Sequence, residues 1–269
     1  MKLSRIAAFS SSLLLGAVLA LTGAGQTQAS DNAAALDYVA LGDSYSAGVG
    51  AGSYDSASGN CMRSTKAYPK LWAAAHSPSS FAFTACSGAR TDDVKAGQLA
   101  PLSSATDLVS ITVGGNDAGF SDVMITCVLQ SESNCISRIN QAKSYVDSTL
   151  PGKLDSVYSA IRTKAPSARV VVIGYPRFYK LGDGCTFGLS DRARSAINEA
   201  ADYLNTAVAK RAANHGYDFA DVVPAFTGHE ICSGSEWLHS VNWFNLTESY
   251  HPTRAGQSGG YLPVFTAHA

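Results

Sequence analysis

The stretch DYVALGDS, from Asp37 to Ser44, joins an apolar, β-forming run to the tripeptide Gly-Asp-Ser. A short continuous apolar run is typical of a strand that is covered on both faces of a parallel sheet. A serine placed directly after such a strand lies at the carboxyl edge of the sheet, where α/β proteins bind their ligands. Ser44 can attack a substrate only if a base takes its proton and donors hold an oxyanion, so these partners must come from elsewhere in the chain.

Apolar runs that resemble buried strands alternate with helix-like segments along the rest of the chain. This alternation predicts an α/β fold with a doubly wound parallel sheet. The expected strands are Tyr38 to Leu41, Phe81 to Ala85, Leu108 to Val113, Val170 to Ile173 and Phe219 to Val222. The expected helices are Tyr68 to Ala75, Ile136 to Ala165 with a break near Pro151, and Ser190 to His215.

The first residues have the features of a secretory signal peptide. Lys2 and Arg5 precede an apolar core from Leu13 to Leu21, and small residues follow. The core is too short for a bilayer span of about 20 residues, so we expect no stable membrane insertion. With cleavage between residues 29 and 35, residues 1–34 form the signal peptide and residues 35–269 form one domain. We therefore expect a secreted, extracellular protein.

Charge and cysteine content narrow the possible partners. The chain has 20 basic and 21 acidic residues, which gives no electrostatic reason to expect a nucleic-acid partner. Six cysteines in an exported chain predict three disulfides, and no cysteine or histidine cluster has the spacing of a metal site. Pairing by proximity in chain order gives Cys61 with Cys86, Cys127 with Cys135, and Cys185 with Cys232. The first bridge would tie the loop after Ser44 to the segment around Gly88, and we expect it to stabilise the fold by about 2 to 4 kcal/mol.

Small residues and one amide follow the second and third expected strands. Gly88 lies in the Cys-Ser-Gly-Ala segment after the second strand, and Asn116 lies in the Gly-Gly-Asn-Asp segment after the third. A glycine lets a backbone N–H approach a substrate, and an asparagine side chain offers an NH₂ donor. Together with the Ser44 N–H, these groups can form an oxyanion hole. Taken singly, the glycine could simply make a turn and the asparagine could cap a helix.

The candidate base is His251, which carries an acidic residue, Glu248, three positions upstream. An imidazole whose Nδ1 is held by a neighbour can present Nε2 to a serine. His229 and His239 are alternatives without a comparable acidic residue. The other three are interpreted as structural or terminal: His76 and His215 at helix ends, and His268 near the disordered chain end.

The segment Gly256 to Gly260 also matches the pattern G-x-S-x-G of a nucleophile elbow. Ser258 follows a loop rather than a strand, so we interpret Gly259-Gly260 as the end of a short helix. Several aromatic residues could line an acyl pocket or belong to the core: Phe178, Tyr179, Trp237, Trp243 and Phe244.

Four blocks occur in the order of the SGNH, or GDSL, hydrolase superfamily: Gly-Asp-Ser at 42–44, Gly88, Gly-Gly-Asn-Asp at 114–117, and His-Pro at 251–252. The chain resembles the secreted lipases and esterases of Streptomyces type in that superfamily, over almost all of its exported part. The resemblance implies a flavodoxin-like three-layer α/β/α fold and no metal or cofactor. It also implies Ser44 as nucleophile, His251 as base, and an oxyanion hole formed by Ser44 N–H, Gly88 N–H and the Asn116 side chain.

Two positions depart from the family pattern: Tyr45 stands where the family usually has leucine, a change that leaves the chemistry intact, and Glu248 stands where the family usually has aspartate. Two alternatives remain for the group that orients His251: the Glu248 carboxylate or the backbone carbonyl of Ser249. The longer arm of a glutamate favours the carbonyl.

The expected function is that of a secreted serine ester hydrolase, a lipase or esterase that cleaves carboxylic esters such as acylglycerols. Phospholipid deacylation and carbohydrate deacetylation are alternatives. A secreted binding module without catalysis is a further alternative, although such a module would not need Ser44, Asn116 and His251 together. We expect a monomer whose partner is a small-molecule or lipid ester.

Overall fold

A computed structural model of the protein describes residues 36–182, 185 and 188–269. The expected signal peptide at residues 1–34, with its cleavage region, lies outside the described residues. In the part of the chain that is described, no helix is long and apolar enough to cross a membrane.

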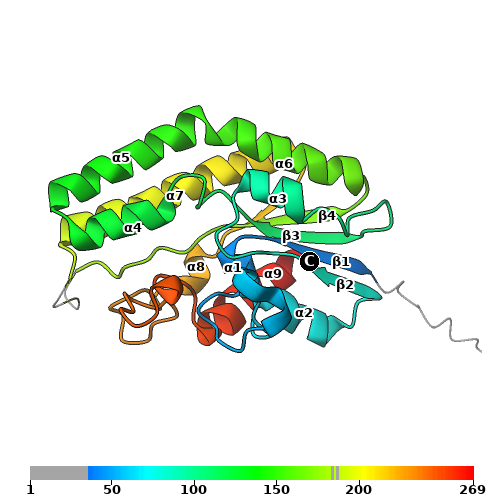
Figure 1. Ribbon diagram of the computed structural model, residues 1–269, viewed down its shortest axis with the longest axis horizontal. Coiled ribbons are helices and arrows are strands. Elements are labelled where there is room, and N and C mark those ends of the chain that lie inside the picture. Colours follow the sequence, from blue (N-terminus) through cyan, green and yellow to red (C-terminus); the bar gives the residue numbers. More distant parts are fainter. Residues whose placement is uncertain (1–35, 183–184, 186–187) are drawn as a thin grey trace, which may run out of the picture. The chain divides into compact units, whose positions relative to one another are not determined.

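The centre of the fold is a parallel sheet with the strand order β2-β1-β3-β4-β5 (Figure 1). Its strands are β1 (Asp37–Gly42), β2 (Ser80–Phe83), β3 (Leu108–Thr112), β4 (Arg169–Ile173) and β5 (Asp218–Ala220). Each lies where the sequence predicted a strand, so the predicted doubly wound α/β architecture is confirmed.

Two of the strands end two residues earlier than expected, and β3 ends one residue earlier, at Thr112. The regular ladder of β2 stops at Phe83 because the N–H groups of Thr84 and Ala85 both donate to the Ala40 carbonyl, at 2.9 and 3.2 Å. β5 stops at Ala220 rather than Val222, because the chain turns there into the short helix α8 (Val223–Phe226). One polar residue follows each strand, Thr84 and Asp221, and the apolar residues Ala85 and Val222 after them hide these boundaries in the sequence.

Helices cover the sheet on both faces and complete the three-layer fold (Figure 1). On one face lie α2 (Tyr68–His76) and α9 (Leu262–His268), and on the other lie α3 (Thr91–Gly97), α6 (Leu150–Lys164) and α7 (Asp191–Asn214). Outside α7, the helices α4 (Phe120–Leu129) and α5 (Glu132–Ser148) pack against each other, and α5 contacts α7.

The predicted break near Pro151 is confirmed, since α5 and α6 are separated at Thr149 and the proline lies in the first turn of α6. The α5 helix begins before the expected Ile136, because the Ser131 side chain accepts from the Asn134 N–H and caps it at Glu132. The helices α3, α4 and α8 were not predicted, and neither were α1 (Ser44–Ala47) and the 3₁₀ helices Ser56–Cys61 and Leu246–Glu248. A short helix was expected to end at Gly259-Gly260, and the structure has the π-helix Gly256–Tyr261 there.

The expectations for the last part of the chain need correction. Gly259 and Gly260 do not end a helix, because the π-helical segment continues directly into α9. Both glycines lie against aromatic rings: a side chain at Gly259 would come within 2.8 Å of Trp237, and one at Gly260 would overlap Phe226. His268 is the last residue of α9 rather than part of a disordered end.

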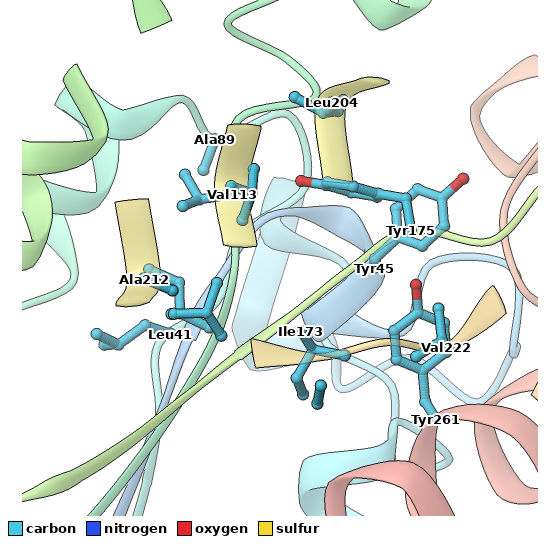
Figure 2. Packing of buried hydrophobic residues seen from close by; sticks show 14 of the residues in the cluster. Leu41, Tyr45, Ala89, Val113, Ile173, Tyr175, Leu204, Ala212, Val222 and Tyr261 are labelled. Carbon is cyan, nitrogen blue, oxygen red and sulfur yellow. The ribbon is translucent and has the colours of Figure 1, made fainter. Parts of the chain in front are cut away.

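The register of the sheet brings the expected site segments together. Gly42, the last residue of β1, pairs with Thr112, the last residue of β3, so the residues that follow each strand meet at one edge. Beneath this edge the core is densely aromatic, and the rings of Tyr45 and Tyr175 pack edge to face with centroids 5.1 Å apart (Figure 2).

Candidate active site

Ser44 is the first residue of α1, directly after the strand that the sequence predicted. The turn depends on Gly42, whose φ of 126° is in a region that favours glycine, and a side chain there would come within 2.9 Å of the Thr112 N–H group. Asp43 is the N-cap of the helix, and Gly48 ends the helix in the left-handed conformation. Ser44 is only 6% exposed, so the turn presents its hydroxyl into a confined space.

The side chain of Asp43 holds this turn in place through hydrogen bonds. Its side chain is buried and accepts from the Tyr45 N–H at 3.0 Å, the Thr112 hydroxyl at 2.6 Å and the Tyr175 hydroxyl at 2.5 Å. Burial raises the pKa of Asp43 to about 6, and the three donors act in the opposite direction. The carboxylate is therefore ionised at neutral pH and fixes the position of Ser44 without touching its hydroxyl.

His251 faces Ser44 from the other side of the site. Its Nε2 lies 2.7 Å from the Ser44 Oγ, and its Nδ1 lies 3.0 Å from the Ser249 carbonyl oxygen. A carbonyl can only accept, so Nδ1 carries the proton and the unprotonated Nε2 accepts from the serine hydroxyl. Burial lowers the pKa of His251 to about 4, which keeps the ring neutral at physiological pH.

The structure also decides between the two groups that could orient His251. Glu248 turns away from the imidazole, and its Oε1 accepts from the Tyr54 hydroxyl at 2.6 Å. That hydroxyl in turn accepts from the Gly50 N–H at 2.9 Å. Glu248 thus ties its loop to the loop after α1, and the Ser249 carbonyl is the group at Nδ1, as the sequence favoured.

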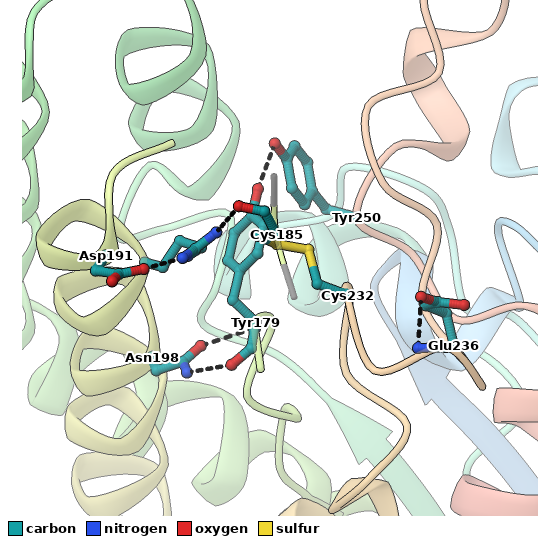
Figure 3. Close-up of a disulfide and its surroundings, with 9 residues drawn as sticks. Tyr179, Cys185, Asp191, Asn198, Cys232, Glu236 and Tyr250 are labelled. Carbon is teal, nitrogen blue, oxygen red and sulfur yellow. Dashed lines mark hydrogen bonds and ion pairs between the residues drawn. A yellow bond between two sulfur atoms is a disulfide. The ribbon is translucent and has the colours of Figure 1, made fainter. Parts of the chain in front are cut away.

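Tyr250, the residue before His251, has an unusual backbone conformation, with φ at 64°. Its carbonyl accepts from the Tyr45 hydroxyl at 2.7 Å, and its own hydroxyl accepts from Tyr179 at 2.9 Å. The backbone of Tyr179 is fixed by the Asn198 side chain, and Figure 3 shows these contacts beside the disulfide of Cys185 and Cys232. None of these tyrosine contacts could be recognised from sequence, because both partners look like ordinary core residues.

Three N–H groups are available near the Ser44 hydroxyl. Within the described residues, the backbone N–H groups of Ser44 and Gly88 donate to no protein acceptor. Gly88 has a φ of 77° and lines the same cleft as Ser44 and Asn116. The Asn116 side chain gives one N–H to the Ala89 carbonyl at 3.1 Å and keeps its second N–H for a ligand.

The segment that carries Gly88 is attached to β1 by several bonds. The Cys86 N–H donates to the Gly42 carbonyl at 2.9 Å, and the disulfide with Cys61 joins the same segment to the loop after α1. Gln98, which sequence reasoning missed, bonds both backbone groups of Gly42, at 2.7 and 2.8 Å.

All three disulfides expected from chain order are present: Cys61–Cys86, Cys127–Cys135 and Cys185–Cys232. The described residues include no group of three or more His, Cys, Asp or Glu side chains that could hold a metal ion.

The remaining histidines lie away from Ser44 in structural positions. His76 and His215 stand at helix ends, as expected, and His229 stacks on Trp237 with ring centroids 3.6 Å apart. His239 is closer to the site, with its Nε2 at 2.8 Å from the Gly50 carbonyl oxygen. It helps to hold the loop that bears Gly50 against the loop that bears His251.

Two connected pockets open on Ser44. We call the first the outer cleft, of about 370 Å³, which lies between α4 and the 241–251 loop and includes Gly88, Asn116 and His251. The second, the inner pocket, of about 70 Å³, continues past Ser44 between α4, α5 and α7. Apolar side chains line most of the inner pocket, among them Val123, Met124, Val146, Phe178 and Leu204.

The five aromatic residues considered from sequence have different positions. Phe178 lines the inner pocket and Trp243 lines the outer cleft. Tyr179 donates to Tyr250, and Trp237 is partly buried and packs against the core, so neither is a wall of these two pockets. Phe244 is fully exposed and lines neither pocket.

Ser258 has none of the surroundings of Ser44. It is exposed within the π-helical segment, and its hydroxyl donates weakly to the Ala255 carbonyl at 3.4 Å. The G-x-S-x-G match is therefore accidental.

Known proteins share the sequence and the fold of this chain. Lipase 1 of Streptomyces coelicolor is 70% identical over 269 residues, which cover 100% of both chains. The crystal structure of phospholipase A1 from Streptomyces albidoflavus has a TM-score of 0.86 at 68% identity, covering 88% of this chain and 100% of that chain. The extracellular lipase of Streptomyces rimosus has a TM-score of 0.86 at 63% identity, covering 87% and 100%. Residues 40–258 match the GDSL-like lipase/acylhydrolase family. This chain therefore belongs to the GDSL-like lipase/acylhydrolase family.

Proposed function

We propose that this protein is a secreted hydrolase of carboxylic esters that cleaves acylglycerols and related lipids through an acyl-enzyme on Ser44. The observation that carries the proposal is the 2.7 Å contact between the Ser44 Oγ and the His251 Nε2, at a point where an apolar inner pocket and an open cleft meet. Membership of a hydrolase family and the lipase names of its relatives support the same conclusion.

In the proposed reaction, His251 Nε2 takes the proton of Ser44 as Oγ bonds to the ester carbonyl carbon. The carbonyl π electrons move to oxygen, and the oxyanion is held by the N–H groups of Ser44 and Gly88 and by the free N–H of Asn116. Collapse expels the alcohol, which receives the proton from His251. A water molecule, deprotonated by the same Nε2, then releases the fatty acid and restores Ser44.

His251 gains a positive charge during each of these steps. The Ser249 carbonyl stabilises that charge through the hydrogen bond at Nδ1 and fixes the ring orientation, the two tasks that a carboxylate performs in a Ser-His-Asp triad. The active centre is thus proposed to be a Ser-His dyad with a backbone acceptor.

The outer cleft supports a neutral lipid as the substrate. Its lining residues include apolar side chains such as Ile125, Val128 and Trp243, and no Lys or Arg. A phosphate group would find no cationic side chain there, which favours acylglycerols. Phospholipid deacylation is the second candidate, because the S. albidoflavus relative at 68% identity is a phospholipase A1.

Residues 1–34 are proposed to be a removable signal peptide, in keeping with the extracellular lipase of S. rimosus among the relatives. Residues 35–269 are proposed to act as one monomeric catalytic domain without a cofactor and without a nucleic-acid partner.

Hydrolysis of p-nitrophenyl esters of increasing chain length tests the proposal. We expect Ser44→Ala to lose turnover by about 10⁴-fold or more, whereas Ser258→Ala, the matched control, keeps the wild-type rate. Medium- and long-chain esters should be preferred to acetate. Equal rates for wild type and Ser44→Ala would refute the proposed nucleophile, and activity on acetate alone would refute lipid esters as the substrate class.

A further inference from the structure

Five large apolar side chains are strongly exposed beside the outer cleft. We call them the rim patch: Ile125, Leu129, Trp243, Phe244 and Leu246, with exposed fractions of 56%, 63%, 63%, 102% and 62%. Single exposed apolar residues are common on soluble proteins, but a contiguous group of this kind marks an interaction surface.

The rim patch is continuous with the proposed substrate site. Ile125 and Leu129 are one turn apart on α4 and therefore point from the same face of the helix. Both line the outer cleft together with Trp243 and Leu246 from the opposite loop. Phe244 extends beyond the cleft next to Trp243. The two segments thus form the two sides of the opening that leads to Ser44.

The charges near the rim patch indicate which kind of surface it fits. The segments 120–129 and 241–248 contain no Lys or Arg. Their two acidic residues are both engaged, because Asp122 lies 3.6 Å from Arg138 and Glu248 accepts from Tyr54. Binding to an anionic membrane uses clusters of basic residues, and none is present in these segments.

We infer that the rim patch inserts into a neutral lipid–water interface and places the outer cleft against the lipid. This inference rests on the proposed function, since it supplies the route by which a water-insoluble ester reaches Ser44. Trp and Phe side chains on a short exposed loop, opposite apolar residues on one helix face, are suited to the boundary between headgroups and acyl chains. The ester can then enter the cleft without first passing through water.

The binding test uses the Ser44→Ala protein, so that the lipid is not consumed during the measurement. Co-sedimentation with phosphatidylcholine vesicles measures the partition between lipid and water. We expect Phe244→Ser to weaken this partition about tenfold, which corresponds to about 1.4 kcal/mol. Leu181→Ser is the matched control, because Leu181 is 48% exposed but lies outside the rim patch, and its partition should not change.

Rates on a soluble and on an emulsified ester distinguish a loss of interface binding from damage to the catalytic centre. In the protein with Ser44 intact, Phe244→Ser should hydrolyse soluble p-nitrophenyl acetate within twofold of wild type, because Phe244 lines neither pocket. Its rate on an emulsified triacylglycerol should fall about as much as its partition. If Ser44→Ala were fully active on the soluble ester, the proposed function would fail whatever the vesicles show.

Three results would overturn the inference itself. The first is a parent protein that does not bind neutral vesicles, or a Phe244→Ser protein that binds them as well as its parent. The second is binding that requires phosphatidylglycerol and is lost in about 0.5 M salt, because salt at that concentration screens electrostatic attraction. The third is a dimer in sedimentation equilibrium that Phe244→Ser dissociates, which would make a second copy of the chain the partner.

Discussion

Ser44 lies on a turn whose polar groups are held by buried side chains, whereas His251 lies on a surface loop held mainly through backbone groups. Next to Ser44, the buried Asp43 carboxylate accepts three hydrogen bonds. Beside His251, the Ser249 and Tyr250 carbonyls accept the hydrogen bonds that fix the ring and the chain. The Ser44 turn is therefore coupled to the core, and the His251 loop is attached to it at a few points.

This difference implies different consequences for mutation. A change in the Ser44 turn leaves buried polar groups without partners, which costs stability as well as activity. A change of one side chain on the His251 loop leaves the backbone acceptors in place. The two regions can therefore be distinguished by comparing stability with turnover.

The largest effect is expected for Asp43→Ala, which removes a helix cap and leaves the Thr112 and Tyr175 hydroxyls buried without their acceptor. We expect the free energy of unfolding to fall by about 3 kcal/mol or more in urea titrations. Glu248→Ala is the matched control on the other loop, because it removes one hydrogen bond at a half-buried position and should cost about 1 kcal/mol. Similar losses of unfolding free energy for Asp43→Ala and Glu248→Ala would contradict the proposed difference between the Ser44 turn and the His251 loop.

The pH dependence of kcat/KM tests the surroundings of His251. Burial lowers its pKa to about 4, so the base form persists as the pH falls and is lost only as the pH passes below that value. We expect no loss from protonation of His251 between pH 8 and pH 5, and a fall of about tenfold per pH unit below pH 4. A smaller change near pH 6 is expected from Asp43, whose pKa burial raises to about 6. A histidine with an ordinary pKa near 6.5 would lose about 30-fold by pH 5, and such a profile would disprove the proposed environment.

The smallest effect is expected for the turnover of Glu248→Ala. Glu248 contacts Tyr54 rather than His251, so its removal loosens the loop but leaves the Ser249 carbonyl at Nδ1. We expect kcat to fall only a few-fold, with the pH profile unchanged. A loss of three or more powers of ten in initial-rate measurements would make Glu248 a member of a triad.

Sequence reasoning recovered the parts of this site that depend on local pattern. Buried parallel strands are continuous apolar runs, so the strand before Ser44 and the segments that carry Gly88 and Asn116 could be located. His251 was identified by its neighbours in the chain. The structure places these four residues together around one cleft.

The contacts that hold the site could not be predicted in this way. Asp43 meets Thr112 and Tyr175 across separations of 69 and 132 residues, and Gln98 meets Gly42 across 56. Nothing in the identity of a tyrosine or a glutamine tells which distant group it bonds. The α4 helix was missed for a local reason, because its start at Phe120 has no capping side chain and its residues are mostly apolar on every face.

The central claim is that Ser44 reacts because His251, oriented by the Ser249 carbonyl, takes its proton. Diethyl p-nitrophenyl phosphate, which phosphorylates activated serines, tests it through the rate of p-nitrophenol release and mass spectrometry of the labelled peptide. We predict one phosphoryl group on Ser44 in wild type, a rate within a few-fold in Glu248→Ala, and a rate lower by about 10³-fold or more in His251→Ala. Labelling of another side chain, or equal rates for wild type and His251→Ala, would contradict the account.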